Sequence, residues 1–159
     1  MATVEENVTI ATGTAGDLDS VMLVMNAAFG RRYGEAWTRS QLSGILPMAG
    51  VSLALANDCQ SGETVGFSLV RAVADEAELL LIAVLPGCHR RGIGRQLLEN
   101  FLERARNDGI SRVHLEVRDG NPAVGMYHNA GFSAVGRRRN YYRAPNGTLF
   151  DAITLASQL

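Results

Sequence analysis

Apolar side chains recur at helical spacing in four segments of the chain. In residues 15–29 they fall three and four positions apart, and Asp17 stands near the start, as is common in a first helical turn. A second long stripe runs from Gly92 to the Asp-Gly pair at 108–109, which is a typical helix end. Thr38 is a suitable N-cap for a short helix. Helices are therefore predicted over residues 15–29, 37–45, 92–108 and 122–132.

Between these helices the pattern is that of strands. Residues 77–85 form a nearly continuous apolar run stopped by Pro86 and Gly87, which is typical of a central strand buried on both faces. Turn residues separate the remaining apolar or alternating runs. Strands are predicted over residues 8–14, 51–56, 64–73, 77–85, 111–117, 133–142 and 149–156. The order β-α-α-β-β-β-α-β-α-β-β predicts an α/β fold in which helices flank a mixed sheet.

Composition narrows the class of protein. A chain of 159 residues fits one domain over 1–159, whose core needs neither a metal nor a disulfide. Cys59 and Cys88 are predicted to be free thiols of a reducing compartment. The N-terminus lacks signal-peptide features and no apolar run approaches the ~18 residues of a membrane span, so we expect a cytoplasmic protein without a membrane partner. The net charge of −1 gives no overall attraction to nucleic acid, so any anion site must be local.

The most informative local feature is the turn between the central strand and the second long helix. The N–H groups and dipole of a first helical turn favour a phosphate, and Gly92 and Gly94 allow it to approach the backbone closely. Leu97 stands where a dinucleotide-binding loop has its third glycine, and Arg95-Gln96 where a Walker A loop has Lys-Ser or Lys-Thr. We predict a pyrophosphate site; a glycine-rich loop with solvated arginines is the alternative. The predicted contacts are His89, Arg90, Arg91, Gly92, Ile93, Gly94 and Arg95.

Three segments resemble the GCN5-related N-acetyltransferase (GNAT) family. Residues 76–102 are similar to its motif A, whose Q/R-x-x-G-x-G/A signature wraps the pyrophosphate of acetyl-CoA. Residues 112–132 resemble the strand and helix that follow in the family. Residues 136–156 resemble the C-terminal hairpin of the RimI-type branch, which acetylates the N-terminal alanine of a small-subunit ribosomal protein. The resemblance implies acetyl-CoA as co-substrate, no metal, and the N-terminal segment of a ribosomal protein as partner.

The same resemblance implies roles for individual residues. Glu116 matches the proposed general base, Tyr127 the general acid for the leaving thiolate, and Asn121 a cofactor contact. His89 stands where the family has Gln or Arg, and Asn121 lies six steps before Tyr127, one fewer than is usual in the family. We expect the loop at Pro122 to absorb this difference. The acetyl carbonyl is expected beside backbone N–H groups of Ile82, Ala83 and Val84.

The residues themselves also support an acid and a base. In the predicted strand around it, Glu116 alternates with apolar neighbours and so faces the other side of the sheet, where a carboxylate indicates either function or an ion pair. A pair with Arg112 or Arg118 is the alternative, and His114 on the same face is a rival base. The phenol of Tyr127 is protonated at neutral pH, since its ordinary pKa is near ~10, and can donate to a thiolate.

Residues 137–143, Arg-Arg-Arg-Asn-Tyr-Tyr-Arg, permit two interpretations. They could form a nucleic-acid patch with stacking tyrosines, but strand alternation sends Arg138 to the face opposite Arg137 and Arg139. We therefore favour a hairpin that shapes a peptide groove, with no direct nucleic-acid contact. The predicted function is acetyl transfer to an N-terminal alanine α-amine. Acetylation of a small-molecule amine and a non-catalytic acetyl-CoA-binding module are the alternatives.

Overall fold

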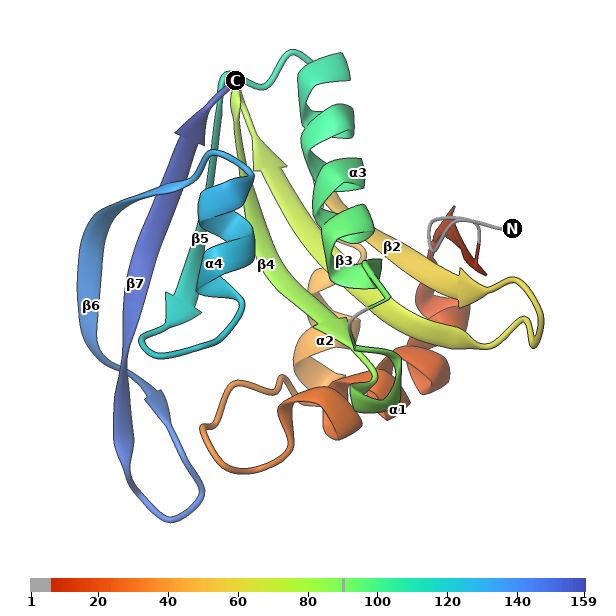
Figure 1. Ribbon diagram of the computed structural model, residues 1–159, viewed down its shortest axis with the longest axis horizontal. Coiled ribbons are helices and arrows are strands. Elements are labelled where there is room, and N and C mark those ends of the chain that lie inside the picture. Colours follow the sequence, from red (N-terminus) through yellow and green to blue (C-terminus); the bar gives the residue numbers. More distant parts are fainter. Residues whose placement is uncertain (1–6, 90) are drawn as a thin grey trace.

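The order of helices and strands in the computed structural model is the predicted one (Figure 1). The structure describes residues 7–89 and 91–159. Its helices are α1 (Leu18–Phe29), α2 (Arg39–Ile45), α3 (Ile93–Asn107) and α4 (Val124–Asn129). Its strands are β1 (Val8–Thr12), β2 (Val51–Asp58), β3 (Thr64–Val73), β4 (Glu76–Val84), β5 (Arg112–Arg118), β6 (Ser133–Arg143) and β7 (Leu149–Gln158).

One mixed sheet organises these elements. Its seven strands lie in the order β1-β2-β3-β4-β5-β7-β6, and β4 is central, as its apolar run predicted. The pair β4–β5 is parallel, because α3 forms the crossover between the two strands, and the remaining pairs are antiparallel. The predicted α/β class with a mixed sheet is confirmed.

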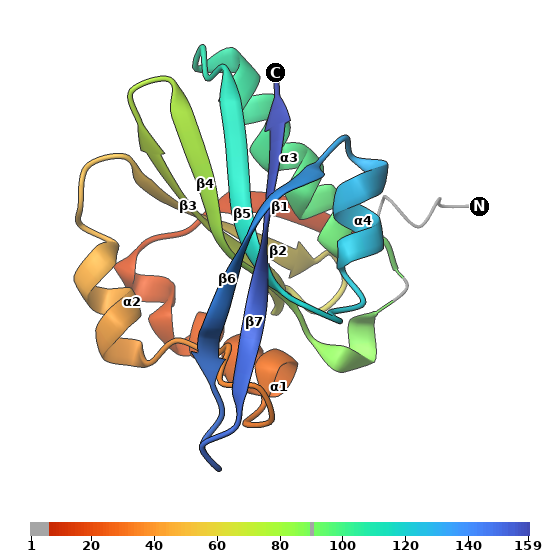
Figure 2. The same cartoon turned by 90° about the vertical axis from the view of Figure 1, so that its left-hand side faces the viewer.

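Helices cover both faces of the sheet (Figure 2). On one face, α1 and α2 bury a cluster that includes Val21, Met25 and Leu42. On the other, α3 and α4 bury a cluster that includes Leu98 and Phe101. Among the described residues, no helix is long and apolar enough to cross a membrane. Helices α1 and α3 each bury a stripe of apolar residues against the sheet.

Helix starts depend on local capping. The hydroxyl of Thr38 accepts a hydrogen bond from the N–H of Gln41, and the N–H of Thr38 donates one to Oε1 of Gln41. The predicted N-cap therefore forms a capping box. The first long helix was predicted from residue 15, but residues 15–17 form a 3₁₀ turn capped by Thr14 and α1 begins at Leu18. The capping box of Thr14 and Asp17 thus starts the 3₁₀ turn, and α1 follows directly after it.

A bulge in β4 changes which residues face each layer. Leu79 pairs with Val70 and Leu81 with Leu69, so Leu80 is an extra residue in β4. Before the bulge, Leu79 packs in the cluster of α3 and α4; after it, Leu81 packs in the cluster of α1 and α2. The apolar run predicted a strand buried on both faces, but periodicity could not reveal this change of face.

The two parallel strands separate after a short pairing. Register between β4 and β5 extends from Glu76–Arg112 to Leu79–Leu115, and the bulge at Leu80 follows at once. Beyond it, β4 stays paired with β3 while β5 stays paired with β7. The carboxyl ends of the two strands therefore diverge, as Figure 1 shows, and leave an opening in the sheet.

Candidate active site

A cavity of about 840 Å³ occupies the opening between β4 and β5. Such a volume is typical of small-molecule sites. Its lining comes from both sides of the sheet, with Gly92 and Tyr127 on the side of α3 and α4 and Phe29 and Trp37 on the side of α1. The predicted site residues that line it are Ile82, Ala83, Val84, His89, Gly92, Ile93, Gly94, Arg95, Glu116, Asn121 and Tyr127. A second cavity of about 250 Å³, between α3 and strands β2–β4, has none of these in its lining.

The turn before α3 presents backbone donors to this cavity. Gly92 is the N-cap with φ 73°, a left-handed conformation that favours glycine, and its carbonyl accepts the helical hydrogen bond of Gln96 at 3.0 Å. The N–H groups of residues 93 and 94 belong to the first helical turn, where backbone donors precede the first helical hydrogen bond. A Cβ added at Gly94 would lie 3.5 Å from Sδ of Met126 in α4, an ordinary van der Waals contact, and a bulkier side chain would take up more of the space beside the turn. The turn can therefore bind an anion through its backbone.

The basic residues of the turn do not act as one group. Nε2 of His89 lies 3.2 Å from the carbonyl oxygen of Val84, at the end of β4. The guanidinium of Arg91 pairs with Asp58 at 3.1 Å, a hydrogen bond that raises the pKa of Arg91, and the cavity lining does not include Arg91 among the described residues. The predicted contact at Arg90 lies outside the described residues. Arg91 as a phosphate contact thus stays a prediction.

Glu116 projects from β5 into the cavity, on the face that strand alternation predicted. Its side chain is only 8% exposed, and both carboxylate oxygens accept hydrogen bonds. Nε of Arg138 donates to Oε1 at 2.7 Å, and Oγ1 of Thr154 donates to Oε2 at 2.7 Å. The sequence alternatives for its ion pair were wrong, because Arg112 pairs with Glu76 and Arg118 with Glu35. The hairpin of β6 and β7 supplies the partners instead.

The rival base His114 occupies a different environment. Its Nε2 lies 3.8 Å from Oε2 of Glu78, and its buried Nδ1 has no hydrogen-bond partner among the described residues. Among the described residues that line the cavity, Glu116 is present and His114 is not. The geometry therefore favours Glu116 as the base.

Tyr127 lies on α4, at the opposite wall of the cavity. The residue is 4% exposed, and its ring packs edge-on against Phe132 with centroids 6.0 Å apart. Burial, and to a lesser extent the charge of Glu35, raises the pKa of the Tyr127 phenol well above its ordinary value. The hydroxyl is therefore protonated at neutral pH.

A buried ion pair forms a part of the cavity that the sequence analysis missed. Nε of Arg118, at the end of β5, donates to Oε1 of Glu35 at 3.2 Å, and both side chains are about nine-tenths buried. The guanidinium also stacks on Tyr33, 3.5 Å from the ring centroid. Nδ2 of Asn121 donates to Oε2 of Glu35 at 3.3 Å. We call these four residues, Tyr33, Glu35, Arg118 and Asn121, the Glu35 cluster.

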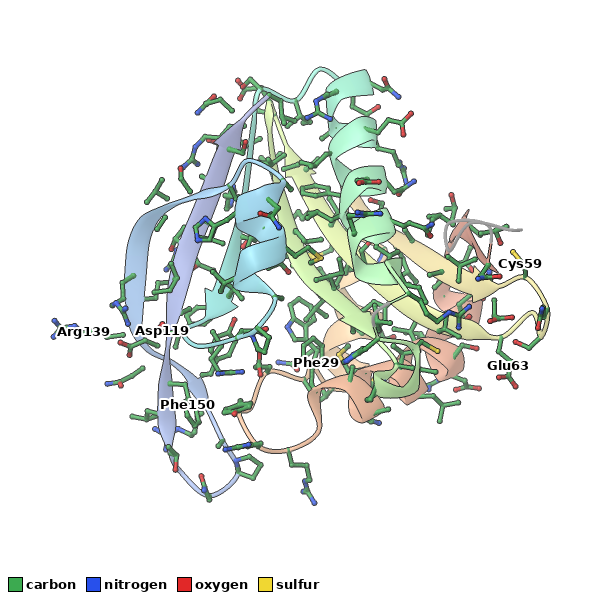
Figure 3. The ribbon with its side chains drawn as sticks, in the orientation of Figure 1. Phe29, Cys59, Glu63, Asp119, Arg139 and Phe150 are labelled. Carbon is green, nitrogen blue, oxygen red and sulfur yellow. The ribbon has the colours of Figure 1, made fainter. Side chains whose placement is uncertain are left out.

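The Glu35 cluster fixes the loop between α1 and α2, residues 30–38, against the C-terminal hairpin. Gly34 has φ 71°, and a Cβ there would lie 1.9 Å from the carbonyl oxygen of Arg143, so only glycine fits. Beside it, Tyr33 packs edge-on against Phe150 of β7, labelled in Figure 3, with centroids 5.0 Å apart. Glu35 and Arg118 are 83 positions apart, so no local pattern links them. The only sequence signal for this loop is the pair Tyr33-Gly34.

Asn121 keeps a place in the cavity despite the short spacing to Tyr127. Its Oδ1 accepts from the N–H of Ala123 at 2.9 Å, and α4 begins only at Val124. Gly120, with φ 88°, and Pro122 lie in the loop before the helix. That this loop absorbs the shorter spacing stays a prediction. Because its amide holds this loop and Glu35, a direct cofactor contact by Asn121 stays a prediction.

An irregular stretch of β6 completes the cavity. Between the pairs Arg138–Ala152 and Tyr142–Phe150, β6 has residues 139–141 where β7 has only Asp151. Asn140 takes φ 54°, and its N–H donates to Asp151 at 2.9 Å. Two consecutive tyrosines, Tyr141 and Tyr142, consequently both line the cavity, although a regular strand would send them to opposite faces.

The three arginines of this hairpin diverge, as alternation predicted. Arg137 pairs with Asp119 at 2.8 Å and Asp151 at 2.9 Å, whereas Arg138 turns to Glu116. Figure 3 shows Arg139 extending outward from β6. The arginines therefore do not form one continuous basic patch.

Together these groups can carry out acyl transfer to an amine. Such a reaction needs a donor-rich anchor for an anionic carrier, a proton acceptor for the amine and a proton donor for the leaving group. The turn at Gly92, the carboxylate of Glu116 and the phenol of Tyr127 meet these needs within one cavity.

A comparison of the sequence with protein families agrees with this chemistry. Residues 20–132 match the Acetyltransferase (GNAT) family, a segment that contains α3, β5 and α4. The chain is 40% identical over 98 residues to the [ribosomal protein bS18]-alanine N-acetyltransferase of Escherichia coli K12, covering 61% of this chain and 66% of that protein. It is 41% identical over 99 residues to the N-alpha-acetyltransferase RimI of Mycobacterium tuberculosis, covering 59% of each. The matches thus span 66% and 59% of the lengths of these two relatives.

The fold is also similar to that of solved structures. The crystal structure of the ribosomal-protein-S18-alanine N-acetyltransferase from Escherichia coli superposes with a TM-score of 0.84 at 30% identity. The alignment covers 95% of this chain and 93% of that one.

Proposed function

Because the chain belongs to the GNAT family of acetyltransferases, we propose that it transfers the acetyl group of acetyl-CoA to the α-amine of an N-terminal alanine in a small-subunit ribosomal protein. The names of the relatives from Escherichia coli and Mycobacterium tuberculosis support this acceptor. One observation carries the proposal: a single cavity joins the anion-binding turn at Gly92 to the carboxylate of Glu116.

The residues at the turn fit acetyl-CoA, the co-substrate of the family. Backbone N–H groups of residues 93 and 94 would bind the pyrophosphate, and Gly94 lets it come close to the helix. The edge of β4 that β5 leaves unpaired, at Ile82, Ala83 and Val84, would face the acetyl carbonyl. When bound, acetyl-CoA supplies an acetyl thioester, an acyl group activated toward amines.

Glu116 and Tyr127 would move the two protons of the reaction. The substrate's α-ammonium gives a proton to the Glu116 carboxylate, directly or through one water, and the neutral nitrogen then forms the new C–N bond. As the C–S bond breaks, the Tyr127 hydroxyl donates to the leaving sulfur. The attacking nitrogen loses its second proton to solvent as the amide forms, and Tyr127 regains a proton from solvent. The raised pKa of Tyr127 ensures that its proton is present at the start.

The acceptor end of the cavity fits an extended peptide end. Tyr141 is half-exposed and packs edge-on against Tyr142, with centroids 4.9 Å apart, and the pair faces Trp37 and the α1–α2 loop across the cavity. Aromatic walls of this kind contact a peptide backbone over several atoms, which a small amine cannot match.

The proposal is tested by intact-mass analysis of peptides incubated with acetyl-CoA. An N-terminal alanine peptide with downstream basic residues should gain one acetyl group on its α-nitrogen. The same peptide with a blocked α-amine but intact lysines should stay unmodified. If the blocked peptide or spermidine is acetylated as efficiently, the enzyme acetylates small or side-chain amines and the proposed acceptor is wrong. If no acceptor in the panel is acetylated, the non-catalytic alternative holds.

A further inference from the structure

Both oxygens of the proposed base, Glu116, accept a hydrogen bond in the free protein. The bonds are short, and one comes from Arg138 and one from Thr154. A carboxylate that must receive a proton from an incoming ammonium needs at least one oxygen facing that ammonium. Each oxygen keeps a second lone pair, but the Glu116 side chain is only 8% exposed, so an incoming ammonium needs the space that one of the two partners now takes.

The two partners differ in how easily they can leave. The Arg138 side chain is 61% exposed, whereas Glu116 is 8% exposed, so the guanidinium can return to water at little cost. Thr154 lies within the continuous pairing of β5 with β7, directly opposite Glu116, and its β-branched side chain has few χ1 rotamers. Arg138 is accordingly the replaceable partner.

Arg138 also has a second place to rest. It is the last regularly paired residue of β6 before the irregular stretch at 139–141. Its guanidinium already lies 5.9 Å from the ring centroid of Tyr141, which is half-exposed at the cavity wall. A cation released from Glu116 can therefore stack on that ring or extend into solvent.

The charges around Glu116 favour the binding of one cation at a time. Glu78, the neighbouring carboxylate in the cavity lining, is paired with Arg71 at 3.1 Å and lies near His114. Glu35 is paired with Arg118. At Glu116 one carboxylate faces one guanidinium, and a second cation added there would meet repulsion from the first.

We propose that the α-ammonium of the substrate replaces Arg138 as the cation bound to Glu116, so that Arg138 occupies the amine subsite of the free enzyme. This inference rests on the proposed function. Binding is then an exchange of one cation for another, which disfavours peptides without a free α-amine. After transfer, the product amide carries no charge; once Glu116 loses its proton to solvent, Arg138 returns to Glu116, and the product has no ionic contact there.

The test compares Arg138→Met with Arg139→Met, a neighbouring exposed arginine on the same strand. Removing the competing cation should lower KM for the free alanine peptide by about 2- to 5-fold, the range of an exposed ion pair. The Kd of the Nα-acetylated product peptide should not fall, because that peptide carries no ammonium to compete with Arg138. Arg139→Met should behave like wild type in both assays, and circular dichroism verifies that the variants are folded.

Other outcomes overturn the exchange. A lower kcat at unchanged KM in Arg138→Met would make Arg138 a residue that orients Glu116, and no change at all would make it a surface pair. Equal tightening of both peptides would mean that the substitution only widens the groove. If the wild-type enzyme fails to acetylate the free peptide, the proposed acceptor fails instead, and this outcome is recorded before any variant is compared.

Discussion

The two ends of the cavity are built in different ways. The cofactor end comes from one continuous segment, the end of β4, the turn and the first residues of α3, and its donors are backbone N–H groups. The acceptor end comes from side chains of the α1–α2 loop, β5 and the β6–β7 hairpin, which the chain brings together over more than 80 positions. The first end depends on glycine and helix geometry, the second on long-range ion pairs and aromatic contacts.

This contrast teaches where substitutions should act. Side-chain changes at the cofactor end should matter when they fill space, because the binding groups are in the backbone. Changes at the acceptor end should matter when they remove a charge or a ring, because those groups hold the walls and carry the chemistry. The predictions below use this difference.

The largest expected effect is on stability, at Arg118. Arg118→Met leaves the carboxylate of Glu35 nine-tenths buried without its cation, which should lower the free energy of unfolding by about 3 kcal/mol or more. Urea unfolding measures it. The matched control is Arg39→Met, because Arg39 pairs with Asp19 on the surface, with side chains 55% and 87% exposed. That loss should stay below about 1 kcal/mol. Equal losses would show that the Glu35 cluster does not hold the acceptor wall.

A somewhat smaller effect is expected on catalysis at Glu116. Glu116→Gln keeps the shape of the side chain and its contact with Thr154 but removes the proton acceptor, so kcat should fall about 10²-fold or more near neutral pH. Calorimetry should find acetyl-CoA affinity unchanged, since Glu116 lies at the acceptor end. The comparison variant is His114→Gln. Should that variant lose more activity at equal stability, His114 is the base and Glu116 its support.

Much of the fold could be predicted from the sequence, because its signals are local. The central strand, the helix after Gly92 and the alternation around Glu116 depend on periodicity and on single glycines, and each was found in the expected place. The family resemblance is likewise carried by continuous stretches of the sequence, and the match of residues 20–132 to the family confirmed it.

The features that were missed depend on contacts distant in sequence. The bulge at Leu80 lies within an unbroken apolar run, so no change of pattern marks the residue where the strand bends away from β5. Glu35 stands in a loop without periodicity, and its partner Arg118 was one of two alternatives that the sequence offered as an ion-pair partner of Glu116. The true partner of Glu116, Arg138, reaches it only through the pairing of β5, β7 and β6.

The most direct test of the division between the two ends is acetyl-CoA calorimetry on folded Gly94→Val and Tyr141→Ala proteins. A valine at 94 fills the space beside Met126 and should weaken acetyl-CoA binding at least about 10-fold, through lost hydrogen bonds to the pyrophosphate. Tyr141→Ala should leave that affinity unchanged and raise only the KM of the peptide. Unchanged acetyl-CoA affinity in Gly94→Val, or an equal loss in both variants, would contradict the account.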